Sequence, residues 1–62
     1  MANARYDILE MFEGEWAVID VATGKAAEVN GVKQVGLEWS QADDLADLLN
    51  HLQAEREAAT LH

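Results

Sequence analysis

The fold is decided by the stretch Ser40-Gln41-Ala42-Asp43-Asp44-Leu45-Ala46-Asp47-Leu48-Leu49-Asn50-His51-Leu52. Its leucines recur at helical spacing, about 100° per residue, and form one apolar stripe: Leu45, Leu48, Leu49 and Leu52. Ser40 is a preferred N-cap residue, because its side-chain oxygen can accept a hydrogen bond from an otherwise unpaired backbone N–H. The pattern predicts an amphipathic helix from Gln41 to about Ala58, with Ser40 as its cap.

Two apolar runs before this helix predict an antiparallel hairpin. Tyr6–Phe12 is followed by Glu13-Gly14, which suits a tight turn, and then by Glu15–Val21, which is rich in β-branched and aromatic residues. A short helix over Tyr6–Phe12 stays open as an alternative, because its apolar residues also fit helical spacing. In the hairpin, a two-residue loop would place one set of residues on a single face: Leu9, Met11, Trp16 and Val18.

The middle of the chain predicts further short strands. Ala22–Lys25 reads as a second turn, Ala26–Val29 as a third strand, and Asn30-Gly31 as a type I′ turn. Val32–Val35 is either a fourth strand or an irregular return. The predicted fold is α+β, a single domain over residues 1–62. It has a small antiparallel meander of three or four strands over about 6–36 and one C-terminal helix, about 41–58, packed on one face.

Both faces of the predicted sheet are largely apolar, whereas a half-solvated sheet alternates apolar and polar residues. One helix can cover only one face. A domain of 62 residues is also small enough to need disulfides, a metal or oligomerisation as support, and this chain has no Cys. We therefore expect a homodimer that pairs through the second face or the edge strand, with the face of Leu9, Met11, Trp16 and Val18 as the candidate dimer or partner surface.

The charge of the chain limits its partners. Twelve acidic residues against four basic ones give a net charge of −8. This charge disfavours direct binding to nucleic acid and to anionic membranes, and it favours either solubility or a basic protein partner. An acidic helix face is the candidate surface for such a partner: Asp43, Asp44, Asp47 and Glu55. A sharper alternative is an acidic inhibitor from a phage or mobile element, similar in action to an anti-CRISPR, that imitates nucleic acid and blocks a basic groove.

Candidate sites of other kinds have simpler explanations. Asp47, His51 and Glu55 stand at i, i+4 and i+8, but three residues of one helix rarely converge on one ion, and a solvated face explains them. We expect no metal, no cofactor and no catalytic residue. Trp16 and Trp39 are expected in the core, and an exposed Trp would instead be a candidate binding hot spot.

Targeting signals are not evident in the sequence. The segment that begins Met1-Ala2-Asn3 does not lead into the apolar region of a signal peptide. No apolar run approaches the roughly 20 residues that span a bilayer. We expect a cytoplasmic protein.

Two segments carry a resemblance to known proteins: Trp16-x-Val18-x-Asp20-x-x-Thr23-Gly24, and the later run Ala42-x-x-Leu45-Ala46-x-Leu48-Leu49-Asn50. The chain resembles short stand-alone bacterial and phage proteins in which a β-meander precedes one helix. This resemblance covers about residues 6–52 and implies a fold. It implies no activity and no functional residues.

Overall fold

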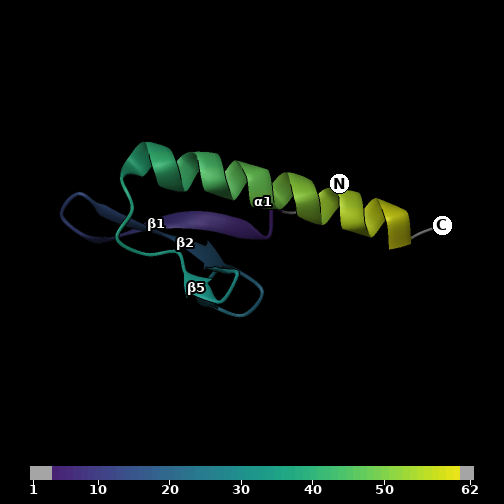
Figure 1. Cartoon of the computed structure of the whole chain (residues 1–62), viewed down its shortest axis with the longest axis horizontal. Coiled ribbons are helices and arrows are strands. Elements are labelled where there is room, and N and C mark those ends of the chain that lie inside the picture. The colour runs from purple at the N-terminus through teal and green to yellow at the C-terminus, as the bar shows by residue number, and fades with distance from the viewer. Residues whose placement is uncertain (1–3, 61–62) are drawn as a thin grey trace.

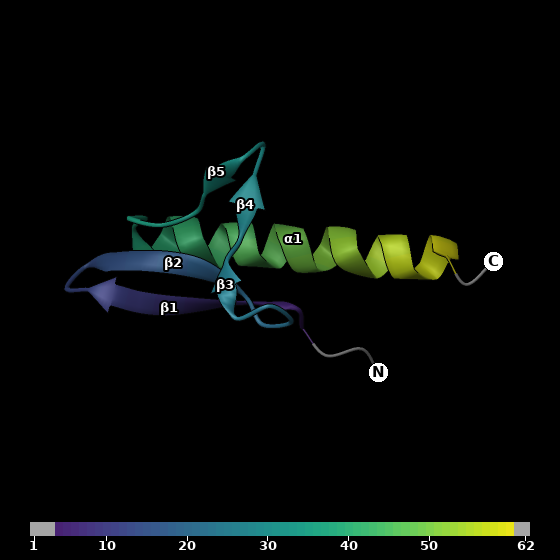
Figure 2. The ribbon, with the colours of Figure 1, turned by 90° about the horizontal axis from the view of Figure 1, so that it is seen from below.

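One helix lies along one face of an antiparallel sheet in the computed structural model, which describes residues 4–60 (Figure 1). The elements in chain order are β1 (Tyr6–Phe12), β2 (Glu15–Asp20), β3 (Lys25–Ala26), β4 (Glu28–Val29), β5 (Val32–Lys33) and α1 (Trp39–Thr60). The sheet has the order β1-β2-β3, and β4 and β5 form a separate hairpin that projects beside it (Figure 2). The predicted α+β class is confirmed, and Tyr6–Phe12 is a strand, not a helix.

The register of β1 and β2 differs from the predicted one. Ile8 pairs with Val18 and Leu9 with Ala17, and the register shifts between Glu10 and Phe12. Met11 is the extra residue of this β-bulge. A bulge lets two residues of one strand oppose one of its partner, so the predicted register, which put Leu9, Met11, Trp16 and Val18 on a single face, was wrong.

The segment after β3 continues the sheet on the far side of β2. Its hydrogen bonds run from Val18 N to the carbonyl of Gln34 (3.0 Å) and in both directions between Trp16 and Leu37 (2.7 and 2.8 Å). Between β4 and β5 the chain reverses at Asn30 and Gly31, whose φ angles of 53° and 79° are the two positive values of a type I′ turn. The Asn30-Gly31 turn is therefore confirmed, while the predicted strand over Ala26–Val29 is divided at Ala27 into β3 and β4.

Glu38, not Ser40, caps the helix. The carbonyl of Glu38 accepts the first helical hydrogen bond from Ala42 N (3.0 Å). The backbone N–H of Glu38 donates to the Gln41 side chain (3.0 Å), the reciprocal half of a capping box. The predicted cap was wrong because Gln41, three residues after Glu38, supplies this bond and Ser40 falls inside the first turn.

The core is narrow and lined by small side chains. Its buried cluster is Val18, Ala27, Ala42 and Ala46, and partly buried apolar residues pack against it: Tyr6, Ile8, Trp16, Leu37, Leu45 and Leu49. Leu48 and Leu52 are 53% and 38% exposed, so the predicted leucine stripe is only half correct. The small side chains of Ala42 and Ala46 allow α1 to lie close to the sheet, and this contact centres the buried face on the alanines.

The helix is longer than the sheet beneath it. In Figures 1 and 2 its second half runs past the ends of β1 and β2. From His51 to Ala59 only Gln53 is half-buried, and the rest are exposed. No helix within residues 4–60 has both the length and the apolar composition needed to cross a membrane.

Candidate interaction surfaces

A polar clasp holds the open end of the β1–β2 hairpin. The Arg5 guanidinium donates two hydrogen bonds to the carboxylate of Asp20, from Nε to Oδ1 and from Nη2 to Oδ2, both at 3.1 Å. Asp20 Oδ1 also accepts from the N–H of Ala22 at 3.0 Å. The hydrogen bond from Arg5 lowers the pKa of the Asp20 carboxyl below its ordinary value, and the same bond raises the pKa of Arg5. The Arg5 guanidinium lies 5.8 Å from the centre of the Tyr6 ring.

Asn50 ties the helix to the start of β1. Its Oδ1 accepts from the N–H of Tyr6 (2.8 Å), and its Nδ2 donates to the carbonyl of Tyr6 (3.0 Å). One side-chain amide thus satisfies both main-chain groups of a strand residue, as a neighbouring strand would. Local sequence patterns place Asp20 in a strand and Asn50 in a helix, and they assign no structural role to Arg5. Their contacts join residues far apart in sequence, which no local spacing reveals.

The four residues of the predicted apolar face are not brought together. Val18 is fully buried in the core, and Trp16 packs partly buried against it. Leu9 and Met11 are instead 52% and 53% exposed. The correction follows from the bulge, because the shifted register turns Val18 toward the helix and leaves Leu9 on the opposite face.

The sheet face away from the helix carries its own apolar residues. Leu9 pairs with Ala17, Phe12 with Glu15, and Ile19 with Asp7, so these residues share the outer face. Phe12 is 72% exposed and Leu9 52%, whereas Ile19 is half-buried. The outer face therefore exposes Leu9 and Phe12 beside the half-buried Ile19, with Asp7 and Glu15 among them, and α1 does not cover it; Ala17, on the same face, is fully buried.

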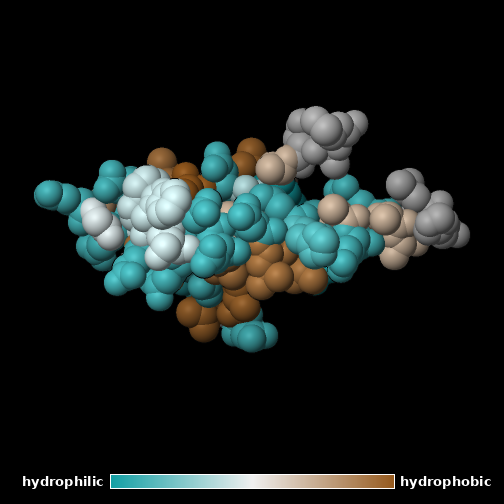
Figure 3. All heavy atoms as spheres, turned by 90° about the horizontal axis from the view of Figure 1, so that it is seen from above, coloured by the Kyte–Doolittle hydropathy of each residue, from teal (hydrophilic) through white to brown (hydrophobic). Residues whose placement is uncertain are grey.

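A second apolar area lies on the helix flank. Leu48 and Leu52 stand nearly opposite Asn50 around the helix, so they face away from β1. Val32 of the projecting hairpin is 61% exposed. Figure 3 shows apolar atoms along this flank of the helix that continue over the hairpin. Trp39, at the start of α1, is 54% exposed, so the expectation of a core position for it was wrong.

The predicted acidic face is largely open to solvent. Asp44, Asp47 and Glu55 are exposed, and Asp43 is half-buried. Glu55 Oε1 lies 3.1 Å from His51 Nε2, and both side chains are more than 60% exposed (71% for His51 and 62% for Glu55). Within residues 4–60 no group of His, Asp and Glu is placed to hold a metal ion.

Charge is distributed unevenly over the molecule. The bases are Arg5, Lys25, Lys33 and Arg56. Residues 6–24 and 34–55 contain acids but no Lys or Arg. The β1–β2 turn and the first half of α1, which lie at the same end of the molecule in Figure 1, therefore form an acidic end.

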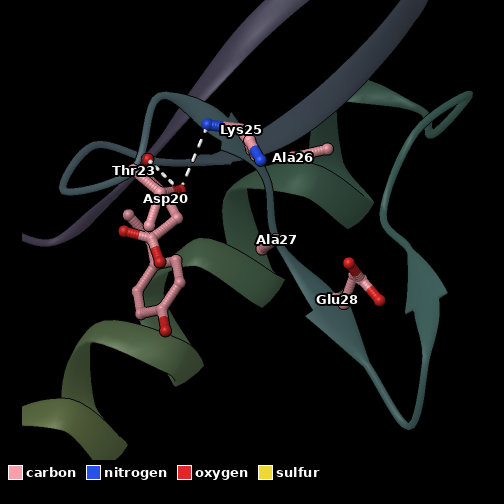
Figure 4. A pocket seen from close by; sticks show the side chains of 7 residues that line it. Asp20, Thr23, Lys25, Ala26, Ala27 and Glu28 are labelled. Atoms are coloured by element: carbon pink, nitrogen blue, oxygen red, sulfur yellow. Dashed lines mark hydrogen bonds between the residues drawn. The ribbon is translucent and has the colours of Figure 1, made fainter.

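A shallow hollow of about 330 Å³ lies beside the clasp. It is lined by Tyr6, Asp20, Thr23, Lys25, Ala26, Ala27 and Glu28. Figure 4 shows Asp20 and Thr23 on one side and Glu28 on the other. The Asp20 carboxylate is already engaged by Arg5, and Thr23 Oγ1 contacts the carbonyl of Asp20 and accepts from Lys25 N. These polar groups stabilise the turn between β2 and β3.

No protein-family model, no curated protein and no solved structure matches this chain. The surfaces described above are therefore the basis for a functional proposal.

Proposed function

We propose that this chain is a small non-enzymatic protein that acts by binding another protein, and that it associates with itself as a homodimer through the outer face of its sheet. The observation that carries the proposal is the exposure of Leu9 and Phe12, 52% and 72%, on the sheet face that the helix does not cover. Contiguous exposed apolar surface on a small protein typically marks an interaction site.

The modest core supports the same proposal. Val18 is the largest side chain that is fully buried within the described residues. A chain of 62 residues gains little from such a core, so burial of the outer face against a second copy would add stability that the single chain lacks.

The test is the oligomeric state. Sedimentation and light scattering should give a dimer for the natural sequence and a monomer for Leu9→Ser/Phe12→Ser. The matched control, Leu48→Ser/Leu52→Ser, removes apolar side chains from the helix flank and should leave the dimer intact. A monomer at every concentration of the natural sequence would contradict the proposed homodimer, and a dimer lost only in the flank variant would place the contact elsewhere.

A second candidate function is inhibition by imitation of nucleic acid. The observation that favours it is the set of exposed carboxylates that α1 carries at Asp44, Asp47 and Glu55. Affinity capture from the source cell should then recover a nucleic-acid-binding protein at low salt and lose it at high salt. The variant Asp43→Asn/Asp44→Asn/Asp47→Asn should lose this partner, whereas capture that resists salt and all three substitutions would contradict the imitation.

A further inference from the structure

The outward edge of β1 presents main-chain groups beyond the contact with Asn50. Across from Ile8 and Glu10, the main chains of Val18 and Trp16 bond to the far side of β2. Val18 binds Gln34 and Ala27, and Trp16 binds Leu37. Ile8–Val18 and Glu10–Trp16 are therefore the pairs of the β1–β2 ladder that share no hydrogen bond. In such a pair the N–H and carbonyl of both residues point away from the partner strand, so those of Ile8 and Glu10 point away from β2.

Asn50 shows that this edge can accept a strand-like partner. Its amide binds both main-chain groups of Tyr6, at 2.8 and 3.0 Å, in the pattern of a paired strand. The next outward N–H, that of Ile8, donates to the Asp7 side chain of its own strand at 2.8 Å. An incoming strand can replace this local bond, and it would continue the pairing that Asn50 begins.

Carboxylates run beside the edge. Asp7 and Glu10 belong to β1, and Glu10 Oε2 also accepts a hydrogen bond from Gly14 N in the β1–β2 turn (3.1 Å). Asp47 and Asp43 lie one and two turns before Asn50 on the same side of α1. Because α1 and β1 run in opposite directions, as Figure 1 shows, these helix residues follow the strand past Ile8 toward Glu10. No Lys or Arg occurs in residues 6–24 or 34–55.

We propose that the free edge of β1, from Asp7 to Glu10, is the docking site for an extended, basic segment of a partner protein, which adds to the sheet as a further strand. The inference rests on the proposed function, because it names the partner class of a protein-binding protein. Charge selects the occupant: a basic strand meets four carboxylates, whereas a second copy of β1 would bring its own Asp7 and Glu10 against them.

The probe is a short synthetic peptide of alternating Lys and Val. Titration should shift the backbone amide NMR signals of Ile8 and Glu10 and slow their hydrogen exchange. Two control peptides separate the contribution of charge from that of strand pairing. The first has Glu in place of Lys and should not bind. The second has alternate backbone nitrogens methylated, which keeps the charge but blocks strand pairing, and it should bind at least about ten-fold more weakly.

Matched variants test the contribution of the helix carboxylates beside β1. Asp43→Asn/Asp47→Asn should weaken binding of the Lys–Val peptide about five-fold, through loss of two partly exposed charge contacts. Asp44→Asn/Glu55→Gln removes the same charge from the side of the helix away from the sheet and should change binding less than about two-fold. Both variants keep side-chain size, and circular dichroism checks that each is folded.

Three outcomes would overturn the edge proposal: no binding of the Lys–Val peptide, equal binding of its methylated form, or signal shifts confined to residues outside β1. None of them bears on the oligomeric state. A dimer that fails to bind the peptide would reject the edge site and leave the proposed function standing. A monomer that binds the peptide at Ile8 and Glu10 would support the edge site and reject the homodimer.

Discussion

The two halves of α1 form one continuous helix but lie in very different surroundings. From Trp39 to Asn50 the helix contributes Ala42 and Ala46 to the core and the Asn50 amide to the edge of β1. From His51 to Ala59 it runs past the sheet, and Gln53 is its one half-buried residue. The difference teaches that tertiary contact decides where this helix is stable, since most helical stability in proteins comes from packing and not from propensity.

Overpacking should give the largest contrast between the two halves. Ala42→Leu or Ala46→Leu forces extra volume into a closely packed contact and should lower the free energy of unfolding by about 1–3 kcal/mol. Ala54→Leu, at an exposed position of the second half, should change it by less than about 0.5 kcal/mol. Urea unfolding followed by Trp fluorescence measures both, and equal effects would refute the contrast.

Loss of the Asn50 amide should rank next. Asn50→Ala leaves the N–H and carbonyl of Tyr6 without their partner in a partly buried place, and we expect a loss of about 1–2 kcal/mol. Gln53→Ala, three residues later, removes an exposed 3.3 Å contact with Glu57 and should cost less than about 0.5 kcal/mol. Urea unfolding curves of the two variants under the same conditions give both losses of unfolding free energy, and equal losses would contradict the prediction.

The Arg5–Asp20 pair should make stability depend on pH. The pKa of Asp20 is lowered in the folded chain from an ordinary value of 3.8, so the pair contributes fully above that value. Its contribution is lost as the pH falls through the lowered pKa. We expect Asp20→Asn to be less stable than the natural sequence at neutral pH, with a difference that shrinks in acid. A difference between Asp20→Asn and the natural sequence that stays constant with pH would contradict the assignment.

The smallest effect is expected in the second half of the helix. His51 Nε2 lies 3.1 Å from Glu55 Oε1, and both side chains are largely exposed. Glu55→Gln should change the free energy of unfolding by less than about 0.5 kcal/mol. Backbone hydrogen exchange gives the complementary readout, because residues 54–59 should exchange by local opening and residues 42–50 only by unfolding of the whole domain.

Local patterns were sufficient for the fold class and most elements. The alternation of turns and β-branched runs predicted β1 and β2, Asn30-Gly31 predicted the second hairpin, and the spacing of the leucines predicted α1. Each of these features depends on neighbours within a few residues of the chain.

The details that need long-range contacts were not predicted. The bulge at Met11 reverses which residues of β1 face the helix, and nothing in the local sequence signals one extra residue. The rotation of α1 onto Ala42 and Ala46 depends on how closely helix and sheet approach. The predicted apolar face is therefore divided in the structure. Leu9 and Met11 are exposed, whereas Trp16 and Val18 pack between the sheet and the helix.

The alanine-lined contact between α1 and the sheet also constrains how this sequence can drift. Within residues 4–60 the buried apolar positions other than Val18 all hold alanine, and Ala27, Ala42 and Ala46 belong to this contact, whereas Ala17 lies on the outer face. A larger residue there is opposed by volume, and at the two helical positions glycine is opposed by a loss of about 1 kcal/mol in helix propensity. In a saturation-mutagenesis library the helical alanines should therefore tolerate almost no replacement, whereas exposed leucines of the same helix accept many. Under selection for folding, the short distance between helix and sheet would then appear as unchanged alanines at positions 42 and 46.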